Sequence, residues 1–568
     1  MRSPAERRLL AAVAALALAG FAQRAALISG LGFHSDESIF VVTASQPTLL
    51  EVWRATLENP HPPGQYFLLH LLLSASWQPW VLKGASLLAG TATIPLAFAF
   101  GLRLLGAAGG LALAVLVAFS PGLIDLSVVV RNYAVGLALL LASLGSLAAF
   151  LREGRLAQLA AFAGFELLAA TFHYAFLAVF LGSNLVLFLT LLGRRHLRLS
   201  LASAAAQLPV GAFYLFSYLA HVAPRSGDFA GQAATTYAEQ LSVVRRGEWL
   251  PELQGWLHPL AGTCDYLGGS AGPWLLAAAL AGGACLAWRR RWPALGLLLA
   301  PLPFSYGSML AGVSPLGAVR HGTYLFPSLF GLAAALVQHL ASSRPVTRRR
   351  GIAVVLAASL ATLALIYAAL SLHRQLRGIR TVNGLVPGIV AITGIETPTR
   401  LRDIREVGRL LREEVGEHDL VLASYASILV LRTQLDPQPM PYGLREPVSF
   451  HYRGHEIVYR PVVGWSFSAG RLVDALQELA RERELPANAR IWVLRTGWEL
   501  YTLTLGEHLS LTYPHVSNEP WLLDLLNERG QALATAIDSR VALGLERVPD
   551  EHENGLMMRH LERRLRVP

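Results

Sequence analysis

The 568-residue chain has little charge: only 15% of its residues are Asp, Glu, Lys or Arg, whereas 53% are hydrophobic. Its mean hydropathy of +0.43 lies well outside the range of soluble globular domains. The composition therefore excludes a wholly soluble protein and indicates a multi-pass membrane protein.

Cysteine is also scarce. Cys264 and Cys285 are the two cysteines, one in an expected external loop and one inside an apolar run, so no disulfide between them is expected. The net charge of +10 comes from arginines in short clusters between apolar runs. Such clusters set the orientation of a chain across a bilayer, and nucleic acid is not an expected partner. The sequence shows no internal repeat.

Twelve strongly apolar segments are present, and most of them are long enough to cross about 30 Å of hydrocarbon as helices. They lie at residues 9–28, 66–82, 85–105, 111–124, 132–151, 157–171, 173–193, 199–220, 273–288, 293–312, 322–341 and 352–371. The segment at 66–82 would begin and end on the same side, so we expect it to be re-entrant or interfacial. This leaves about eleven true spans.

Basic residues mark one side of the predicted membrane domain. They lie in short connections at Arg152/Arg155, Arg194/Arg195/Arg198, Arg289–Arg291, and Arg344 with Arg348–Arg350. The positive-inside rule places these connections in the cytoplasm, together with the N-terminal Arg2, Arg7 and Arg8. The opposite, external side then carries the loops at 30–65 and 221–272 and everything after residue 372.

The first apolar segment follows a basic N-terminus, so a cleaved signal peptide is the alternative to a retained helix. The apolar run continues past the length of a normal signal sequence, which favours a retained helix. Arg24 near its end is expected to snorkel toward the outer interface.

The chain becomes charged after Leu372, which indicates a soluble lobe. Asp419–Val430 is typical of a buried strand followed by the start of a helix, and Ile491–Leu494 of a second strand. Helices are expected at Ala475–Glu484 and Trp521–Ala534. The sequence predicts an extracytoplasmic α/β domain at 373–568 without a glycine-rich phosphate loop.

The loop after the first helix contains adjacent carboxylates, Asp36 and Glu37. Loop acids are often merely solvated, and that reading is the alternative here. The expected external ends of other segments supply His61, Lys83, Arg131, His173 and Arg320. A carboxylate facing several cations suits transfer from a phosphate ester, because one group removes a proton and the others neutralise the departing phosphate.

Each of these residues also has a structural alternative. Arg131, Lys83 and Arg320 could simply snorkel to the interface. His173 and Tyr174 could cap a turn between two helices. Glu166, an acid within an apolar segment, is best explained by pairing with a neighbouring helix.

The sequence does not decide whether the chain binds a metal ion. The candidate ligands are His34, Asp36, Glu37 and His61, and HSDE lacks the spacing of a zinc helix motif. Two carboxylates do not diagnose Mg²⁺ or Mn²⁺, so no cofactor is assigned and a divalent metal remains an alternative.

The ordered motifs resemble a known family. They are the acid pair after the first helix, HPPGQYFLLH, RNYA, the HY pair, and the arginine before TYLFP. Together they resemble the GT-C membrane glycosyltransferases, in particular the branch with the protein O-mannosyltransferases and the lipid A aminoarabinose transferases. The likeness covers roughly residues 1–340.

This resemblance implies a polytopic α-helical membrane protein of the GT-C type with about 11–13 transmembrane helices. The GT-C module would cover 1–372, with its catalytic loop at 30–65, followed by the α/β domain at 373–568. The implied reaction is inverting transfer of a sugar from a polyprenyl phosphate on the outer face of the cytoplasmic membrane.

The resemblance also implies residue roles. Asp36 matches the loop acid that serves as general base or positions the acceptor, with Glu37 as its partner. His61, Lys83, Arg131, Tyr133, His173, Tyr174 and Arg320 form the expected substrate-binding set. Relatives commonly have an acid two residues before the arginine of the arginine–tyrosine element, where this chain has Val129. A second catalytic carboxylate is therefore in doubt, although Asp125 could compensate.

Two other readings remain open. A transporter or flippase of lipid-linked saccharides predicts inverted repeats and charges near the bilayer midplane, whereas the charges here gather at one face. A ligase that moves a whole oligosaccharide or polymer is poorly separated from a single-sugar transferase. The sugar and the acceptor, whether protein, glycan or glycolipid, are not readable from the sequence.

Overall fold

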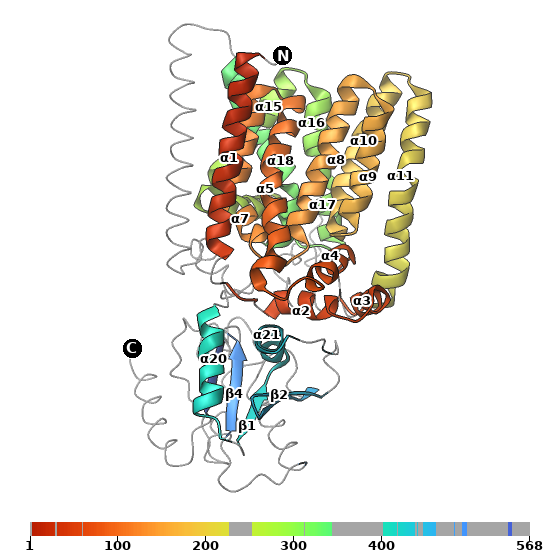
Figure 1. Cartoon of the computed structure of the whole chain (residues 1–568). Coiled ribbons are helices and arrows are strands. Elements are labelled where there is room, and N and C mark those ends of the chain that lie inside the picture. Colours follow the sequence, from red (N-terminus) through yellow and green to blue (C-terminus); the bar gives the residue numbers. More distant parts are fainter. Residues whose placement is uncertain are drawn as a thin grey trace. The chain divides into compact units, whose positions relative to one another are not determined.

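The computed structural model describes residues 3–28, 31–33, 35–59, 61–225, 253–311, 313–317, 319–342, 401–416, 419–437, 440, 447–461, 482, 491–496 and 543–547. The predicted span at 352–371 and the predicted helices at 475–484 and 521–534 lie outside these residues. The chain forms two compact units (Figure 1). The helical unit comprises 1–29, 56–68 and 80–393, and the mixed unit comprises 30–55, 69–79 and 394–568.

The helical unit consists of apolar helices, and the longer ones run side by side (Figure 1). Their bounds are α1 Pro4–Ile28, α5 Pro79–Leu104, α6 Ala107–Phe119, α7 Pro121–Ser127, α8 Tyr133–Glu153, α9 Leu156–Ala170, α10 Leu177–Gly193, α11 Leu197–Ser217, α14 Leu253–Gly268, α15 Gly272–Trp288, α16 Trp292–Leu299, α17 Pro301–Leu310 and α18 Phe326–Ser342. Short turns precede α10 at η1 Tyr174–Phe176 and α18 at η5 Arg320–Leu325. Two more extend α11 at η2 Tyr218–Val222 and η3 Ala223–Arg225, and η4 Gly269–Ala271 joins α14 to α15.

Within the described residues, eight helices are long and apolar enough to cross a membrane, or nine if the bent pair α6–α7 is one span. This confirms a polytopic α-helical membrane protein. The segment predicted not to span forms α4 Gly64–Leu73, a ten-residue helix. At 1.5 Å per residue it reaches only about half the hydrocarbon thickness.

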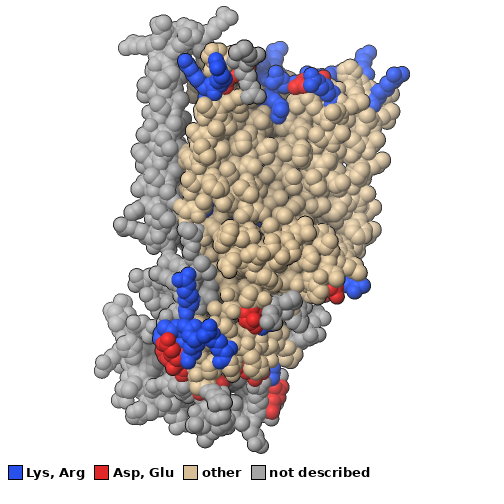
Figure 2. Space-filling model, in the orientation of Figure 1, with Lys and Arg blue, Asp and Glu red and all other residues tan. Residues whose placement is uncertain are grey.

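Lys and Arg side chains gather at one end of the helical unit, the end where the N-terminus lies (Figure 2). Arg152 is in the last turn of α8, and Arg194 directly follows α10. Arg291 donates to the carbonyls of Leu104 and Leu105 at the end of α5, at 2.8 and 3.1 Å. Helices that end at this basic side begin at the other, as α8 does just after Arg131 and α10 shortly after His173.

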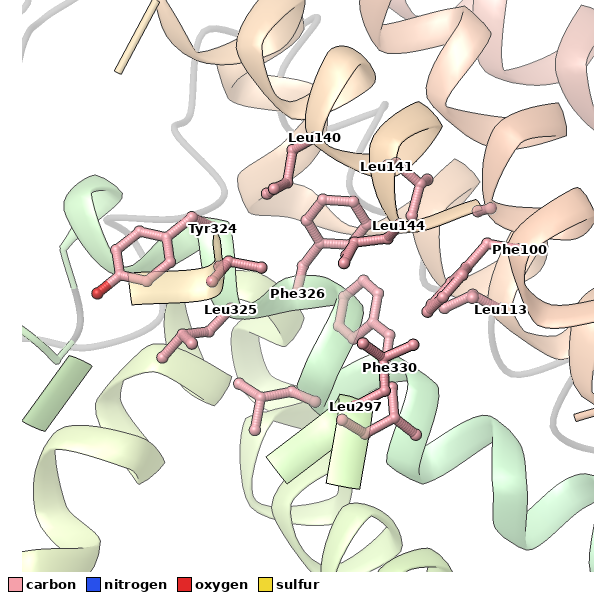
Figure 3. Packing of buried hydrophobic residues seen from close by; sticks show 14 of the residues in the cluster. Phe100, Leu113, Leu140, Leu141, Leu144, Leu297, Tyr324, Leu325, Phe326 and Phe330 are labelled. Atoms are coloured by element: carbon pink, nitrogen blue, oxygen red, sulfur yellow. The ribbon is translucent and has the colours of Figure 1, made fainter. Parts of the chain in front are cut away.

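The core of the helical unit centres on α18. Phe326 and Phe330 are 0% and 1% exposed, and they lie among leucines of α8 and α16 and beside Phe100 of α5 (Figure 3). Small residues let the backbones approach: a Cβ on Gly282 of α15 would lie 1.8 Å from the Leu332 carbonyl oxygen of α18. Close backbone contact of this kind drives helix association in lipid.

The expectation that Arg24 snorkels toward the outer interface was wrong. The side chain does not snorkel to the interface but is 0% exposed, and it donates to the carbonyls of Gly20, Val117 and Ala118 at 3.0, 3.4 and 3.2 Å. Helix α6 ends at Phe119 because Pro121 forces Ser120 into an extended conformation. The last carbonyls of α6 lack intrahelical partners, and the guanidinium satisfies two of them.

Glu166 of α9 is paired across the helix interface, as predicted. Its side chain is 0% exposed, and both carboxylate oxygens accept from Nδ2 of Asn184 on α10, at 3.1 and 3.4 Å. A partner on the neighbouring helix explains how an acid is tolerated at this depth.

The mixed unit contains a five-stranded sheet with the order β2-β3-β1-β4-β5. The strands are β1 Leu420–Ala423, β2 Val448–Tyr452, β3 His455–Tyr459, β4 Ile491–Thr496 and β5 Leu543–Arg547. β1 is parallel to β3 and β4, and both edge pairs are antiparallel. The two predicted strands and the helix start after the first are confirmed. Helices α20 Leu401–Glu413 and α21 Tyr425–Leu435 accompany the sheet (Figure 1).

The loop after α1 also belongs to the mixed unit. It forms α2 Ser35–Ala44 and α3 Leu49–Thr56. Thr48 and Glu51 form a reciprocal capping box at the start of α3: the Glu51 amide donates to the Thr48 hydroxyl at 3.2 Å, and the Thr48 amide donates to the Glu51 carboxylate at 3.1 Å. Val42 of α2 is 1% exposed and lies in the same buried cluster as residues of β1 and α21.

Candidate functional site

Four of the predicted substrate-binding residues come together in the helical unit. They are His61, Arg131, His173 and Arg320, and the structure adds His321. Each lies just before or at the start of a helix, on the side away from the basic clusters of Arg152 and Arg194. We name these five residues the cationic cluster.

Arg131 lies in the turn between α7 and α8, and Tyr133 is the first residue of α8. Both are buried, with exposures of 4% and 1%. Asn132 between them occupies the N-cap position of α8, and its Nδ2 donates to the carbonyl of Phe172 at 2.7 Å. This bond ties the start of α8 to the turn that carries His173.

His173 has one paired and one unpaired ring nitrogen. Its backbone is extended, and its Nδ1 accepts from the Ala175 amide at 3.1 Å, which caps η1. A neutral imidazole that accepts at Nδ1 carries its proton on Nε2. That Nε2 is buried and has no hydrogen-bond partner among the described residues. The cluster therefore contains a buried N–H donor that is available to a ligand.

His321 was not predicted, although it directly follows Arg320 in η5. Its Nδ1 lies 3.3 Å from the hydroxyl of Tyr133, and its ring centroid lies 6.4 Å from that of His173. The Tyr133 and His173 rings are 5.1 Å apart. Three elements, α8, η1 and η5, thus meet through these three rings.

Positive charge surrounds His61. Its pKa is held well below the usual value, first by burial and then by Arg131, with further contributions from His173, His321 and Arg320. Burial is also the main reason that the pKa of His173 falls to about 3, and the charges of Arg131 and Arg320 add to it. Both histidines are therefore neutral hydrogen-bonding groups at physiological pH, and the arginines carry the charge.

The segment that carries His61 is fixed at both ends. Glu58 forms an ion pair with Arg225 at 2.7 Å, and Nε2 of His221 contacts the carbonyl of Asn59. The other ring nitrogen of His221 lies 2.8 Å from the Tyr174 hydroxyl. The Tyr174 hydroxyl therefore helps to hold the segment of His61 in place through His221. The sequence analysis did not single out His221.

Gly64 fixes the other end of the segment. Its amide donates to the Thr171 carbonyl at 2.7 Å, and an added Cβ would lie 2.6 Å from the same oxygen. Only glycine permits this approach, which brings the HPPG turn against the turn before His173.

Three predicted residues remain: Lys83 in the helical unit, and Asp36 and Glu37 in the mixed unit. Lys83 is in the second turn of α5 with its side chain 1% exposed. Asp36 and Glu37 are in the first turn of α2 in the mixed unit, and Glu37 is 1% exposed. Their meeting with the cationic cluster remains a prediction.

In the part of the chain that the structure describes, no group of three or more His, Cys, Asp and Glu side chains could hold a metal ion. The cationic cluster offers the donor groups of an oxyanion site. Two guanidiniums offer charged, fork-shaped donors, and neutral imidazoles add directed N–H groups. A phosphate group matches this arrangement.

The chain is similar over most of its length to solved membrane proteins. ArnT from Cupriavidus metallidurans in the apo state shares 13% identity, with a TM-score of 0.47 over 96% of this chain and 98% of that chain. ArnT from Cupriavidus metallidurans bound to undecaprenyl phosphate shares 13% identity, with a TM-score of 0.44 over 95% of this chain and 97% of that chain. The Archaeoglobus fulgidus oligosaccharyltransferase in complex with Zn and sulfate shares 12% identity, with a TM-score of 0.49 over 86% of this chain and 69% of that chain.

No protein-family model and no curated protein matches the chain.

Proposed function

We propose that the chain is an inverting glycosyltransferase that takes a sugar from a polyprenyl-phosphate donor and passes it to an acceptor hydroxyl. The observation that carries this proposal is the buried, unpartnered Nε2–H of His173 beside Arg131 and Arg320. A donor group buried among cations needs an anionic partner, and in a membrane protein a lipid phosphate supplies one at the required depth.

In the proposed reaction, Asp36 removes the proton of the acceptor hydroxyl. The acceptor oxygen then attacks the anomeric carbon while the bond from that carbon to the phosphate oxygen breaks. The leaving polyprenyl phosphate gains one negative charge, which Arg131 and Arg320 neutralise. Glu37 supports Asp36, and the isoprenoid tail contributes binding energy away from the reacting carbon.

The site is proposed to lie on the outer face of the cytoplasmic membrane, because the cationic cluster is at the helix ends opposite the basic clusters. Membrane-impermeant labelling of single cysteines in intact cells tests this placement. A cysteine at the exposed Gln78 should react from outside, and one at the exposed Arg155 should react only after permeabilisation. The reverse pattern would contradict the assignment.

The reaction is tested with purified protein and a panel of polyprenyl-phosphate-linked sugars, by following release of polyprenyl phosphate. We expect turnover of one donor by the wild type and its loss in Asp36→Asn. Glu51→Gln is the matched control, since Glu51 is a partly exposed acid of the same loop. Full activity in Asp36→Asn, or loss of activity in Glu51→Gln alone, would remove the assignment of Asp36 as base.

A further inference from the structure

The acid-bearing helix α2 is built into the C-terminal lobe, although almost four hundred residues separate them in the chain. Val42 of α2 belongs to the buried hydrophobic cluster that contains Ile428 and Leu431 of α21, and Ile39 packs against that cluster. The lobe is therefore part of the folded unit that carries Asp36, rather than an attachment to it.

Gln434 of α21 makes a two-point contact just before Asp36. Its Oε1 accepts from the Phe33 amide at 2.9 Å, and its Nε2 donates to the Phe33 carbonyl at 3.0 Å. The same Nε2 also donates to the Val430 carbonyl at 3.1 Å, which fixes the side chain on its own helix. Phe33 is 0% exposed, so these backbone groups depend on protein partners.

Thr433 makes a second contact just after Asp36. Its hydroxyl lies 3.2 Å from the hydroxyl of Ser38, and both residues are buried. The Thr433 hydroxyl also donates to the Leu429 carbonyl at 2.9 Å. A hydroxyl has one proton to donate, so Ser38 is the donor to Thr433.

A third contact lies beyond the other end of α2, where Nε2 of Gln46 donates to the carbonyl of Met440 at 3.2 Å. The contacts of Gln434 and Thr433 bracket Asp36, three residues after Phe33 and two before Ser38. Together they fix both the position and the rotation of the first turn of α2.

We propose that Gln434 and Thr433 are positioning residues for Asp36, so that the C-terminal lobe sets the geometry of the general base through α21. This inference rests on the proposed function. A catalytic group displaced by about 1 Å loses up to about 100-fold in rate. We therefore expect Gln434→Leu to lower kcat about 10- to 100-fold. Thr433→Val should lower it less, since it removes only one hydrogen bond between α21 and α2 and keeps the shape of the side chain.

The effect should fall on kcat and spare donor binding, because the cationic cluster lies in the other unit. We expect the KM for the donor and the Kd for undecaprenyl phosphate to stay within about twofold of the wild type. Asp436→Asn is the matched control. It removes the ion pair between Arg432 in the last turn of α21 and Asp436 directly after the helix, and should leave kcat unchanged.

An engineered disulfide between α2 and α21 should restore the kcat that Gln434→Leu loses. The Ser38 and Thr433 hydroxyl oxygens are 3.2 Å apart, so cysteines at these positions are placed to form a disulfide between α2 and α21. In the Gln434→Leu background, oxidation of Ser38→Cys/Thr433→Cys should recover most of the lost kcat, and reduction should lose it again. A general loss of folding would not follow the redox state in this way.

Hydrogen exchange of the α2 amides provides a readout that needs no substrate. It should rise in full-length Gln434→Leu and not in Asp436→Asn. The inference is overturned if α2 exchange is unchanged. It is also overturned if Gln434→Leu keeps the wild-type kcat while Asp36→Asn is inactive. Absence of turnover in the wild type would instead count against the proposed function, and exchange would still decide whether α21 holds α2.

Discussion

The Tyr133 hydroxyl lies 3.3 Å from Nδ1 of His321, although 188 residues separate the two in the chain. When Tyr133 donates this bond, the proton of His321 is on Nε2. One hydroxyl at the start of α8 thus orients a donor on η5.

Tyr133→Phe should lower kcat/KM for the donor about 2- to 10-fold, because one hydrogen bond contributes about 0.5–1.5 kcal/mol. His321→Gln should lower it further. If the hydroxyl acts through the imidazole, the double variant should be no worse than His321→Gln alone. Additive losses in this double-mutant cycle would show that the two side chains act independently.

Gly64→Ala should disturb the HPPG turn. The new methyl group would lie 2.6 Å from the Thr171 carbonyl oxygen, so the turn must shift, at a cost of about 1–3 kcal/mol. We expect a lower Tm and a raised donor KM. Gly164→Ala is the control: its Cβ meets nothing within 4 Å, and it lies inside α9, where alanine favours the helix. Equal behaviour of the two variants would contradict this reading.

The stability of the ligand-free protein should fall on acidification. The pKa of His173 is lowered from 6.5 to about 3, so below about pH 6.5 the unfolded chain binds a proton that the folded chain does not. This contribution is complete above pH 6.5 and is lost as the pH falls toward 3. His173→Gln should therefore show a smaller Tm difference between pH 7.5 and pH 5 than the wild type, measured by thermal unfolding in detergent. An unchanged difference would show that His173 is not the source.

His221→Gln should loosen the segment of His61. Nε2 of His221 contacts the Asn59 carbonyl, and Nδ1 faces the Tyr174 hydroxyl at 2.8 Å. We expect the donor KM to rise about threefold to tenfold, and Tyr174→Phe to give part of this change. Tyr218→Phe, on the exposed side of the same helical turn, should be silent. A direct role of Tyr174 on the substrate would instead make Tyr174→Phe the more harmful variant.

Much of the helical unit could be predicted from the sequence, because each apolar run and basic connection is a local signal. The alternation of basic ends also predicted that Arg131, His173 and Arg320 share one side. His321 carried no signal of its own, since a single histidine after an arginine fits many surroundings. Tyr174 was singled out, but its link to His221 depends on where the end of α11 lies.

Two features depended on packing that no local pattern reports. The burial of Arg24 follows from the break between α6 and α7, which exposes carbonyls to the guanidinium. Pro121 is a local signal for the break, but no local signal indicates that the break lies beside Arg24. Likewise, α2 and α21 each show ordinary helix signals, and nothing in either indicates that Gln434 bonds the backbone of Phe33.

We propose that a lipid phosphate binds the cationic cluster, and the affinity of the purified protein for undecaprenyl phosphate measures this binding. Arg131→Gln/Arg320→Gln removes both guanidiniums of the cluster. It should weaken binding at least about 10-fold, because hydrogen bonds to charged groups contribute about 1.5–3 kcal/mol each. Asp36→Asn should bind like the wild type, as should Arg152→Gln at the opposite helix ends. Wild-type affinity in the double arginine variant would show that the phosphate does not bind the cationic cluster.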